Sequence, residues 1–366
     1  MNKNNRKKPL LFEKYPKLEE IIPWRYLAPL KTPVRKLEKI AEYLGIDSLW
    51  IKLDNLSSPI YGGNKPRKLE FLLADAIQKN CDKILTLGGI GSNHCVATAA
   101  FCKELNLKSY VALTDQPVTN HVRRNLLLEI YFGSEIIYSP SSKELNNKIS
   151  KTLSENDKIY FIGKGGSTPL GALGFVNAAL ELKHQIEAGS LPEPDYLFVA
   201  NGSTGTTAGL SIGLKLADLN TKIMAIRVTP KSLSARENTI DLALKSKELI
   251  DKAYPDLHHI SFEHLEIFDE YFGGEYGKPT AGGLEAIKLM SELENIMLEP
   301  TYTGKTFGAL IDYVSRQDKD TLEDKTFLFW NTFNSRDFSD ITKNIDYHNL
   351  PKELHWVFEK PMPTYD

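Results

Sequence analysis

Short β-rich runs alternate with longer amphipathic runs along most of this chain, and this alternation restricts the fold more than any other feature. The run at 66–79, for example, carries Leu69, Leu72, Leu73 and Ala76 on one helical stripe. Strands that alternate with helices predict an α/β fold, with an open and mostly parallel sheet covered by helices on both faces. The predicted strands are 48–53, 83–87, 110–113, 135–138, 158–162, 196–200, 222–228 and 326–330.

The length of the chain and its first residues add two expectations. The chain has 366 residues and enough strand–helix units for two domains, although the pattern alone gives no boundary between them. The first thirty residues contain Pro9, Pro16, Pro23 and Pro29. Because proline interrupts regular structure, we expect an irregular arm on the surface there.

Composition narrows the class of protein. Hydrophobic residues make up 42%, charged residues 25%, and the net charge is −2, which is ordinary for a globular protein and favours neither nucleic acid nor anionic membrane as a partner. No apolar run is long enough to span a bilayer, and none follows the basic start to form a secretory signal. Cys81, Cys95 and Cys102 lack CxxC spacing, so we expect neither disulfides nor a metal site, and a cytoplasmic location.

Four glycine-rich turns mark the expected ligand site. In open α/β sheets, ligands bind beyond the carboxyl ends of the strands, where these turns would lie. The turns are YGGNK at 61–65, GGIGSN at 88–93, GKGGS at 163–167 and NGSTGTT at 201–207.

The turn at 201–207 has the composition of a phosphate-binding loop. It follows an apolar strand and precedes a helical run at 208–217. Backbone N–H groups, hydroxyl groups and a helix N-terminus would together bind a phosphate. It lacks the lysine of a P-loop and the GxGxxG spacing, so ATP and dinucleotides are poor candidates. Gly, Ser and Thr are also the residues of an ordinary turn and helix cap, and this loop alone leaves both readings open.

Lys65 is the candidate nucleophile. It follows two glycines and precedes Pro66, which suits the first position of a helix. A buried lysine near other cations has a lowered pKa and becomes a usable amine, and Arg67 and Lys68 would supply such cations and phosphate partners. Spacing alone favours the alternative, a solvated basic helix start.

Ser92 and Asn93 open the next predicted helix. Their side chains could donate hydrogen bonds to a carboxylate, and they are equally the residues that cap any helix.

Taken together, the glycine-rich segments resemble, in order and spacing, the aminocyclopropane-carboxylate deaminase and D-cysteine desulfhydrase family. The resemblance covers roughly residues 30–335 and is carried by YGGNKPRKLEFLL, GGIGSNHCVATAA, GKGGSTPLGALGF, NGSTGTTAGL, EYG and PTYTGK. It implies a pyridoxal 5'-phosphate enzyme with the two-domain open parallel-sheet fold of the tryptophan-synthase-β type (PLP fold type II). The implied large cofactor-binding domain comprises 1–66 plus 177–366, the small domain 67–176, and the active site lies between them.

The same resemblance implies which residues bind the cofactor. Lys65 would be the Schiff-base lysine, Lys68 would help to hold the phosphate, and Asn93 would bond the phenolic oxygen of the ring. Thr303, directly after the tyrosine of PTYTGK, would face the ring nitrogen. The phosphate loop would consist of Ser203, Thr204, Gly205, Thr206 and Thr207.

The implied catalytic residues are Lys65, Ser92, Tyr276 and Tyr302, with Ser92 either meeting the substrate carboxylate or acting on the substrate. For the two tyrosines, a position at the rim without any proton to move is the alternative. The implied substrate-binding residues are Ser92, Asn93, His94, Tyr276, Tyr302 and Thr332.

Three positions are similar to desulfhydrases rather than to deaminases. Deaminases of this family have an acid where this chain has Thr303. An acid keeps the ring nitrogen protonated and the ring a strong electron sink, whereas a threonine hydroxyl would give a weaker one. Thr332 and His94 are also of the desulfhydrase kind.

One segment departs from the family. Asn331 stands where histidine is usual, Phe333 and Asn334 replace two glycines, and the tail after about Ser335 has no counterpart. The resemblance therefore implies a lyase that carries out β-elimination on a small amino acid, D-cysteine or a relative, giving pyruvate, ammonia and sulfide. The alternatives are 1-aminocyclopropane-1-carboxylate deamination and a non-catalytic pyridoxal-phosphate or amino-acid binding protein. A homodimer is expected from the resemblance.

Overall fold

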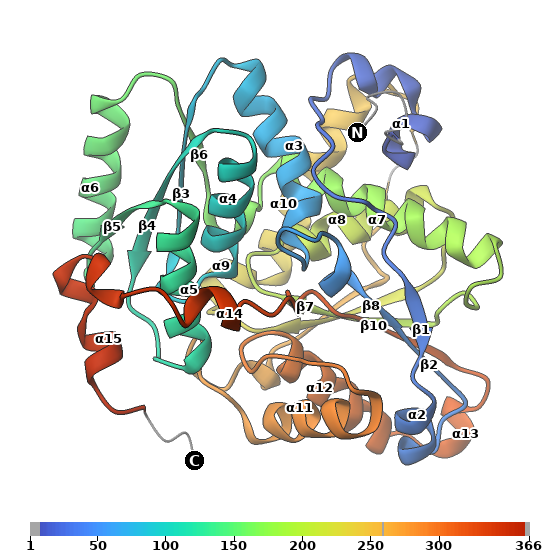
Figure 1. Ribbon diagram of the computed structural model, residues 1–366. Helices are drawn as coiled ribbons and strands as arrows, with labels where there is room; N and C mark the ends of the chain where they lie inside the picture. Colours follow the sequence, from blue (N-terminus) through green and yellow to red (C-terminus); the bar gives the residue numbers. More distant parts are fainter. Residues whose placement is uncertain (1–7, 258–259, 363–366) are drawn as a thin grey trace.

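Two β-sheets form the centre of the molecule (Figure 1); the computed structural model describes residues 8–257 and 260–362. The larger sheet has the strand order β1-β2-β10-β7-β8-β9 and the smaller β5-β4-β3-β6. Within the described residues, neighbouring strands are parallel except β1 and β2. The strands are β1 (Val34–Lys36), β2 (Ser48–Lys52), β3 (Lys83–Gly89), β4 (Lys108–Thr114), β5 (Glu135–Tyr138), β6 (Ile159–Ile162), β7 (Tyr196–Asn201), β8 (Lys222–Arg227), β9 (Leu265–Phe268) and β10 (Thr326–Trp330).

All eight predicted strands are present, and the predicted α/β fold with mostly parallel sheets is confirmed. The sequence pattern missed β1 and β9, which lie at the two edges of the larger sheet. Both are short, and neither is fully buried. A central strand such as β10 is buried at every position and therefore gives a continuous apolar run, which an edge strand lacks.

Helices cover both faces of the larger sheet. Leu197 and Val199 of β7 pack on one side, and Phe198 and Ala200 on the other, because successive side chains of a strand point to opposite faces. The first face is covered by α7 (Pro169–Glu187), α8 (Gly205–Leu216) and α10 (Arg236–Asp251), and the second by α2 (Glu38–Leu44), α11 (Ala281–Glu294) and α12 (Thr303–Ser315).

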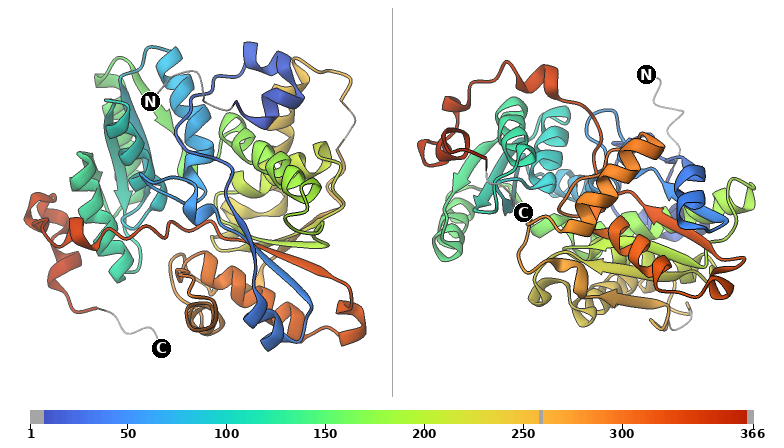
Figure 2. Two further views of the ribbon diagram at one scale, coloured as in Figure 1. Left: turned by 45° about the vertical axis from the view of Figure 1, so that its right-hand side comes forward. Right: turned by 90° about the horizontal axis from the view of Figure 1, so that it is seen from below.

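The smaller sheet is covered in the same way (Figure 2). Ile84 of β3 packs with α3 (Lys65–Gln78), α4 (Asn93–Glu104) and α5 (Asn120–Phe132), whereas Leu85 packs with α6 (Ser142–Glu155). Short helices complete the connections, and they are η3 (Asp54–Leu56), η4 (Lys164–Gly166), α9 (Lys231–Ser234), η5 (Glu270–Phe272) and α13 (Lys319–Leu322).

The amino-terminal arm is more regular than expected. It contains α1 (Leu10–Lys14) and η2 (Pro16–Glu20), and the side chains of Leu11 and Leu18 are fully buried. The backbone N–H of Leu11 donates to Asn177 Oδ1 on α7 at 3.0 Å. The prediction of an irregular surface arm is therefore wrong for these residues, because their apolar side chains join the core of the larger sheet.

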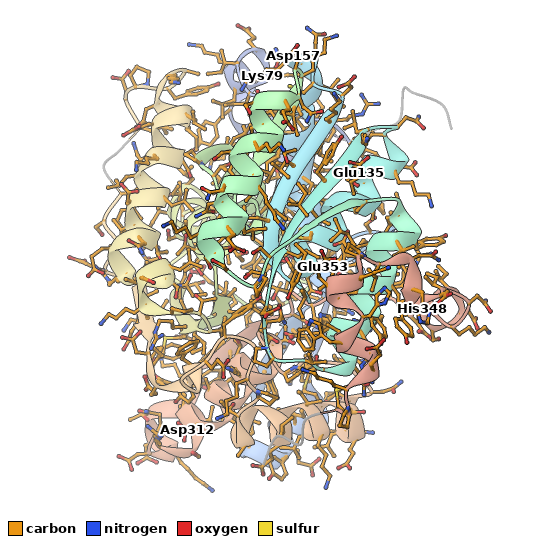
Figure 3. All side chains as sticks on the ribbon, turned by 90° about the vertical axis from the view of Figure 1, so that its left-hand side faces the viewer. Lys79, Glu135, Asp157, Asp312, His348 and Glu353 are labelled. Carbon is orange, nitrogen blue, oxygen red and sulfur yellow. The ribbon has the colours of Figure 1, made fainter. Side chains whose placement is uncertain are left out.

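The tail after Ser335 crosses to the smaller sheet (Figure 1). Phe338 packs with α5, and Leu354 and Val357 pack with Val111 of β4. Figure 3 shows His348 and Glu353 of the tail beside this part of the molecule. The expected grouping of 177–366 into one large domain therefore does not describe the tail, and the other domain boundaries stay a prediction. The tail helices are α14 (Ser339–Thr342), η6 (Tyr347–Asn349), η7 (Lys352–Leu354) and α15 (Trp356–Glu359).

A buried ionic network joins α3 to the larger sheet. Arg67 Nη2 lies 2.7 Å from Asp54 Oδ1, and its Nη1 lies 2.9 Å from Glu181 Oε2. Lys52 Nζ lies 2.5 Å from Glu181 Oε1, and all four side chains are essentially inaccessible. The expectation that Arg67 could bind phosphate is wrong, because two residues after Lys65 a helical side chain points to nearly the opposite side.

Within the described ranges, no helix is both long enough and apolar enough to cross a membrane.

Candidate active site

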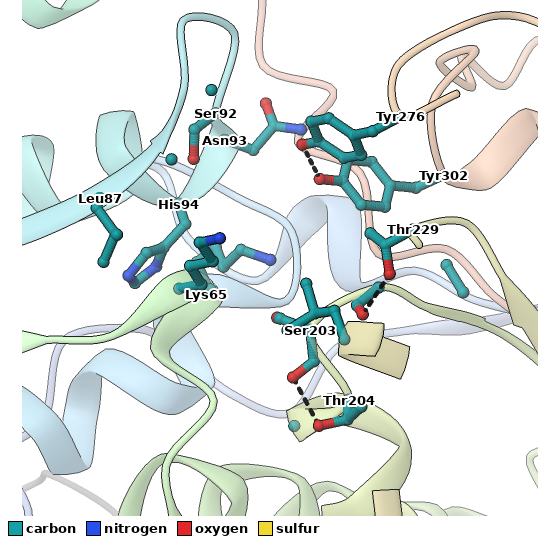
Figure 4. A pocket seen from close by; sticks show the side chains of 18 of the residues that line it. Lys65, Leu87, Ser92, Asn93, His94, Ser203, Thr204, Thr229, Tyr276 and Tyr302 are labelled. Atoms are coloured by element: carbon teal, nitrogen blue, oxygen red, sulfur yellow. Dashed lines mark hydrogen bonds between the residues drawn. The ribbon is translucent and has the colours of Figure 1, made fainter. Parts of the chain in front are cut away.

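A cavity of about 370 Å³ lies between the two sheets, where the glycine-rich turns meet (Figure 4). Its wall comes from the starts of α3, α4 and α8 and from the loops around residues 276, 299 and 332. The turns at 88–93, 163–167 and 201–207 lie at the carboxyl ends of β3, β6 and β7, as the sequence predicted. The sequence-predicted residues that line the cavity are Lys65, Lys68, Ser92, Asn93, His94, Ser203, Thr204, Gly205, Thr206, Tyr276, Tyr302 and Thr332.

Lys65 is the first residue of α3, and Pro66 follows it as the sequence suggested. Its Nζ lies 2.8 Å from Asn64 Oδ1. Burial lowers the pKa of this lysine to about 8, and the negative charge of Glu299 opposes the shift only partly. A substantial fraction of the amine is therefore neutral near physiological pH, which is the form that can act as a nucleophile or a base.

Lys68 lies one helical turn further along α3 and is 1% exposed. Its Nζ donates to the carbonyl oxygen of Gly165 and to Ser167 Oγ, each at 3.1 Å. Burial, with the charge of Lys65 as a second cause, lowers its pKa well below the ordinary value. No carboxylate among the described residues pairs with this ammonium group. A buried cation without a counter-charge favours an anionic ligand beside it.

The loop between β7 and α8 has the shape of an anion site next to Lys68. Thr204 adopts a left-handed conformation with φ of 69°, and its side chain makes no capping hydrogen bond to α8. A Cβ atom on Gly205 would lie 2.8 Å from Lys68 Nζ, so a side chain here would fill the space beside the ammonium group. The N-terminus of α8 and Lys68 therefore both favour negative charge at this point.

The hydroxyl groups of this loop have different surroundings. Ser203 Oγ lies 2.8 Å from Ser167 Oγ, and Thr206 Oγ1 accepts a hydrogen bond from Asn64 Nδ2 at 3.0 Å. Thr207 is not among the described residues that line the cavity; its side chain is fully buried, and its hydroxyl has no partner in the described part of the chain. Its predicted contact with the cofactor stays a prediction.

The start of α4 presents three side chains to the cavity. Ser92 caps the helix, because its oxygen accepts from the N–H of Cys95 at 3.3 Å, which leaves its own O–H free to donate. Asn93 Oδ1 lies 3.1 Å from the hydroxyl of Tyr61. Neither ring nitrogen of His94 has a partner among the described residues. Burial, aided by nearby lysine charges, lowers the pKa of His94 well below its ordinary value, so its ring is neutral.

Tyr276 and Tyr302 face each other, as Figure 4 shows, with their hydroxyl oxygens 2.5 Å apart. Burial raises the pKa of Tyr276 to about 12 and that of Tyr302 well above its ordinary value; the neighbouring tyrosine adds to the second shift. Both hydroxyls therefore keep their protons at neutral pH. One proton is shared within the pair, and the second is available to another acceptor.

Glu299 is a residue of the cavity wall that the sequence pattern missed. Its carboxylate accepts hydrogen bonds from the N–H groups of Thr301, Tyr302 and Thr303 at 2.8–2.9 Å. Burial raises its pKa, and these hydrogen bonds oppose the shift. The residue lies just before α12, where the positive N-terminus of a helix favours an acid.

Thr303 lies next to Glu299. It is not among the described residues that line the cavity, and its side chain is fully buried. Its Oγ1 accepts from the N–H of Glu299 at 2.9 Å and lies 3.2 Å from Glu299 Oε1. The expected contact of this hydroxyl with a ring nitrogen stays a prediction.

The segment that departs from the family borders the cavity as well. Thr332 and Phe333 line it, whereas Asn334 turns away and accepts a hydrogen bond from the N–H of Gly62 at 2.8 Å. A Cβ atom on Gly63, whose φ is 84°, would lie 2.7 Å from the carbonyl oxygen of Thr332. The turn before Lys65 and this segment therefore touch backbone to backbone.

Comparison with known proteins agrees with this geometry. Residues 26–332 match the family described as "Pyridoxal-phosphate dependent enzyme". The D-cysteine desulfhydrase of Serratia proteamaculans (strain 568) is 34% identical over 298 residues, which cover 78% of this chain and 86% of that protein. The D-cysteine desulfhydrase of Salmonella newport (strain SL254) is 33% identical over 314 residues, covering 83% and 90%. A solved "ACC deaminase homologue" superposes with a TM-score of 0.75 and 29% identity, over 96% of this chain and all of the other.

The residues of the cavity fit pyridoxal phosphate. A buried lysine amine, an unpaired lysine beside a helix N-terminus and a glycine that leaves space for an anion are what an aldehyde-bearing phosphate ester requires. The predicted tryptophan-synthase-β fold type and the predicted cofactor are confirmed. This chain belongs to the pyridoxal-phosphate-dependent enzymes, within the group related to D-cysteine desulfhydrase and aminocyclopropane-carboxylate deaminase.

Proposed function

We propose that this enzyme eliminates a β-leaving group from a small amino acid, D-cysteine or a close relative, and produces pyruvate, ammonia and sulfide. The proposal rests on one observation: the amine of Lys65, whose pKa is lowered, lies in the same cavity as the phosphate loop and the Tyr276–Tyr302 pair. Two curated relatives with 33–34% identity bear the name D-cysteine desulfhydrase, which supports this choice of substrate.

Binding of the cofactor would use three groups of residues. Lys68, the N-terminus of α8 and the hydroxyls of Ser203 and Thr206 would hold the phosphate. Lys65 would hold the aldehyde carbon covalently, and Asn93 would bond the phenolic oxygen. When bound, pyridoxal phosphate supplies a conjugated ring that takes up the electron pair left at Cα of an amino acid.

Once the substrate amine has replaced it at the aldehyde carbon, Lys65 Nζ would accept the proton from Cα of the substrate. Because the pKa of this amine is about 8, it takes up a proton readily and can release it again at physiological pH. The bond between Cβ and sulfur would then break, its electron pair would leave with the sulfur, and the electron pair from Cα would form a double bond to Cβ. Water would hydrolyse the released enamine to pyruvate and ammonia. The free proton of the Tyr276–Tyr302 pair would be available to that sulfur.

The start of α4 would orient the substrate carboxylate. Ser92 retains its O–H as a donor, and the neutral ring of His94 carries one N–H and one unprotonated nitrogen without partners in the described residues. Thr332 and Phe333 lie in the same cavity wall and would limit the size of the substrate side chain.

Aminocyclopropane-carboxylate deamination is the second candidate. It is favoured by the solved homologue and by Glu299, since opening a cyclopropane requires a strong electron sink and an acid in the cavity could support one. Thr332 and His94 favour the desulfhydrase.

The enzyme loaded with pyridoxal phosphate should be assayed against D- and L-amino acids and against aminocyclopropane carboxylate. We expect sulfide, pyruvate and ammonia from D-cysteine. Rapid formation of 2-oxobutyrate from aminocyclopropane carboxylate without sulfide from D-cysteine would replace the first proposal by the second.

We also propose that the enzyme is a cytoplasmic homodimer. The support is the family resemblance and the three cysteines, all unpaired in the structure. Sedimentation equilibrium tests the dimer, and fractionation of cells tests the location.

A further inference from the structure

We propose that Tyr61 and Asn125 are positioning residues that fix the side-chain amide of Asn93. In this arrangement the amide NH2 of Asn93 faces the cavity and its carbonyl oxygen points away. The inference rests on the proposed role of Asn93 toward the cofactor. Asn125 lies on α5, outside every motif of the sequence.

The orientation begins at a backbone carbonyl, which can only accept hydrogen bonds. Asn125 Nδ2 lies 2.9 Å from the carbonyl oxygen of Gly91, which requires the NH2 end of Asn125 at this point. The same Nδ2 lies 3.2 Å from Asn93 Oδ1. Because an NH2 group needs an acceptor, the oxygen end of Asn93 must face Asn125.

The opposite orientation of Asn125 is disfavoured. It would turn the carbonyl oxygen of Asn125 toward His121 Nε2, which lies 3.1 Å from the present Nδ2. It would also bring two carbonyl oxygens, those of Asn125 and Gly91, to 2.9 Å from each other. The contact with His121 could then become a hydrogen bond, but the hydrogen bonds to the carbonyl oxygen of Gly91 and to Asn93 Oδ1 would be replaced by contacts between two oxygens.

Tyr61 fixes the same oxygen from a second direction. Its hydroxyl lies 3.1 Å from Asn93 Oδ1. Burial raises the pKa of Tyr61 above its ordinary value, so the phenol keeps its proton and donates it. Two donors on Oδ1 leave the NH2 of Asn93 directed toward Tyr276, as Figure 4 shows.

The departing segment and the tail hold Tyr61 in place. Asn334 Oδ1 accepts from the N–H of Gly62, and Arg336 Nη1 donates to the carbonyl oxygen of Ile60 at 3.1 Å. The ring of Phe338 stacks on the ring of Tyr61 with centroids 6.0 Å apart. Residues on both sides of Tyr61 are therefore fixed by a part of the chain that the family pattern does not contain.

The orientation of Asn93 decides whether its amide presents a hydrogen-bond donor or an acceptor to the ligand. With its NH2 forward, Asn93 donates to an oxygen that carries negative charge, such as the phenolic oxygen of the cofactor. With its carbonyl forward, it would repel that oxygen. Tyr61 and Asn125 would not contact this oxygen themselves. They act by fixing the orientation of the Asn93 amide.

A double-mutant cycle on cofactor affinity tests the proposal. The variants are Tyr61→Phe, Asn125→Leu and Asn93→Ala, with each of the first two also combined with the third. Dissociation constants come from titration of the cofactor-free protein with pyridoxal phosphate, followed by absorbance. We expect each single variant to raise Kd about three- to tenfold, the range for one hydrogen bond. In the Asn93→Ala background, neither should raise it further.

The pH midpoint of the visible absorption band of the bound cofactor gives a second readout. A donor on the phenolic oxygen stabilises its ionised form, so loss of the donor should move the midpoint upward in Tyr61→Phe. Tyr160→Phe is the matched control, since its hydroxyl bonds Asp75 and neither residue lines the cavity.

Full effects of Tyr61→Phe in the Asn93→Ala background, or an unchanged Kd in both single variants, would overturn the proposal. If Asn125→Leu does not fold, the cycle with Tyr61→Phe decides alone. Failure of the proposed function would look different. An enzyme that binds the cofactor but produces no sulfide from D-cysteine would still show the expected increases in Kd in the single variants and none in the Asn93→Ala background.

Discussion

Two groups of buried cations lie on or beside α3 and have opposite surroundings. Arg67 and Lys52 are closed in by the carboxylates of Asp54 and Glu181 and lie away from the cavity. Lys65 and Lys68, which share α3 with Arg67, line the cavity and have no carboxylate partner among the described residues. The difference separates cations that hold the fold together from cations that the fold keeps available for a ligand.

Burial alone does not distinguish the two groups, because all four side chains pay for desolvation. Burial acts to lower the pKa of each of them. At Arg67 the carboxylates of Asp54 and Glu181 outweigh burial and raise the pKa, whereas at Lys52 the pair with Glu181 opposes burial only partly and the pKa stays lowered. Burial also lowers the pKa of Lys65 and Lys68, which have no such pair. Lys305 shows that position also matters. It is buried without a carboxylate partner in the described part of the chain, but its Nζ donates to the carbonyl oxygen of Phe272, outside the cavity.

The largest effect should follow removal of the Lys65 amine. We expect Lys65→Ala to lower the rate of elimination about a thousandfold or more, since the variant lacks both the covalent attachment and the base. Borohydride reduction of the wild-type enzyme should fix the cofactor to Lys65, as peptide mapping would reveal. Circular dichroism should show the fold unchanged. A label on another lysine, or normal turnover by the variant, would contradict this role.

Removal of a paired cation should instead affect folding. Arg67→Ala leaves Asp54 and Glu181 buried with less compensation, and we expect a loss of about 3–5 kcal/mol in the free energy of unfolding. Urea unfolding of the cofactor-free protein measures it. Arg316→Ala is the matched control, because its partner Asp312 forms an exposed i,i+4 pair on α12. Such a pair contributes about 0–1 kcal/mol. Equal losses in both variants would remove the distinction between buried and exposed pairs.

Removal of the unpaired Lys68 should weaken cofactor binding rather than the fold. We expect Lys68→Met to raise Kd for pyridoxal phosphate about 10- to 100-fold, the range for a hydrogen bond to a charged group. The cofactor-free protein should lose little stability, because methionine gives up the two hydrogen bonds of Nζ but requires no desolvation of charge. Lys305→Met should leave Kd unchanged. A stability loss in Lys68→Met as large as that in Arg67→Ala would show that Lys68 belongs to the structural group.

The sequence predicted the part of the site that depends on chain order. The turns at 88–93 and 201–207 lie at the carboxyl ends of β3 and β7, where ligands of open α/β sheets bind. Tyr276 and Tyr302 also lie where the motifs indicated, as a hydrogen-bonded pair.

The parts that the sequence did not reveal depend on side-chain direction and on contacts between distant segments. Arg67 was expected to bind phosphate near Lys65, but its side chain lies on another side of the helix and bonds Asp54 and Glu181. The hydrogen bond between the Thr303 hydroxyl and Glu299 was not predicted either. The contact between the tail and Tyr61 joins residues more than 270 positions apart, and no local pattern encodes it.

The smallest effect is a difference in pH dependence, and it tests the lowered pKa of Lys65 directly. In the cofactor-free enzyme this pKa is about 8, against an ordinary value of 10.5 that applies to the unfolded chain. Between these two values the unfolded chain holds a proton on Lys65 that the folded protein lacks. Raising the pH through this window therefore favours the folded state.

Below pH 8 the lysine is protonated in both states, and its contribution does not change with pH. We therefore expect wild-type protein to gain unfolding free energy relative to Lys65→Met between pH 7.5 and 9.5, by at most about 1.4 kcal/mol per pH unit. Urea unfolding of both proteins at the two pH values measures the difference, and subtraction removes the other titrating groups they share. Parallel pH curves would mean that Lys65 has an ordinary pKa and is not one of the cations that the fold keeps available.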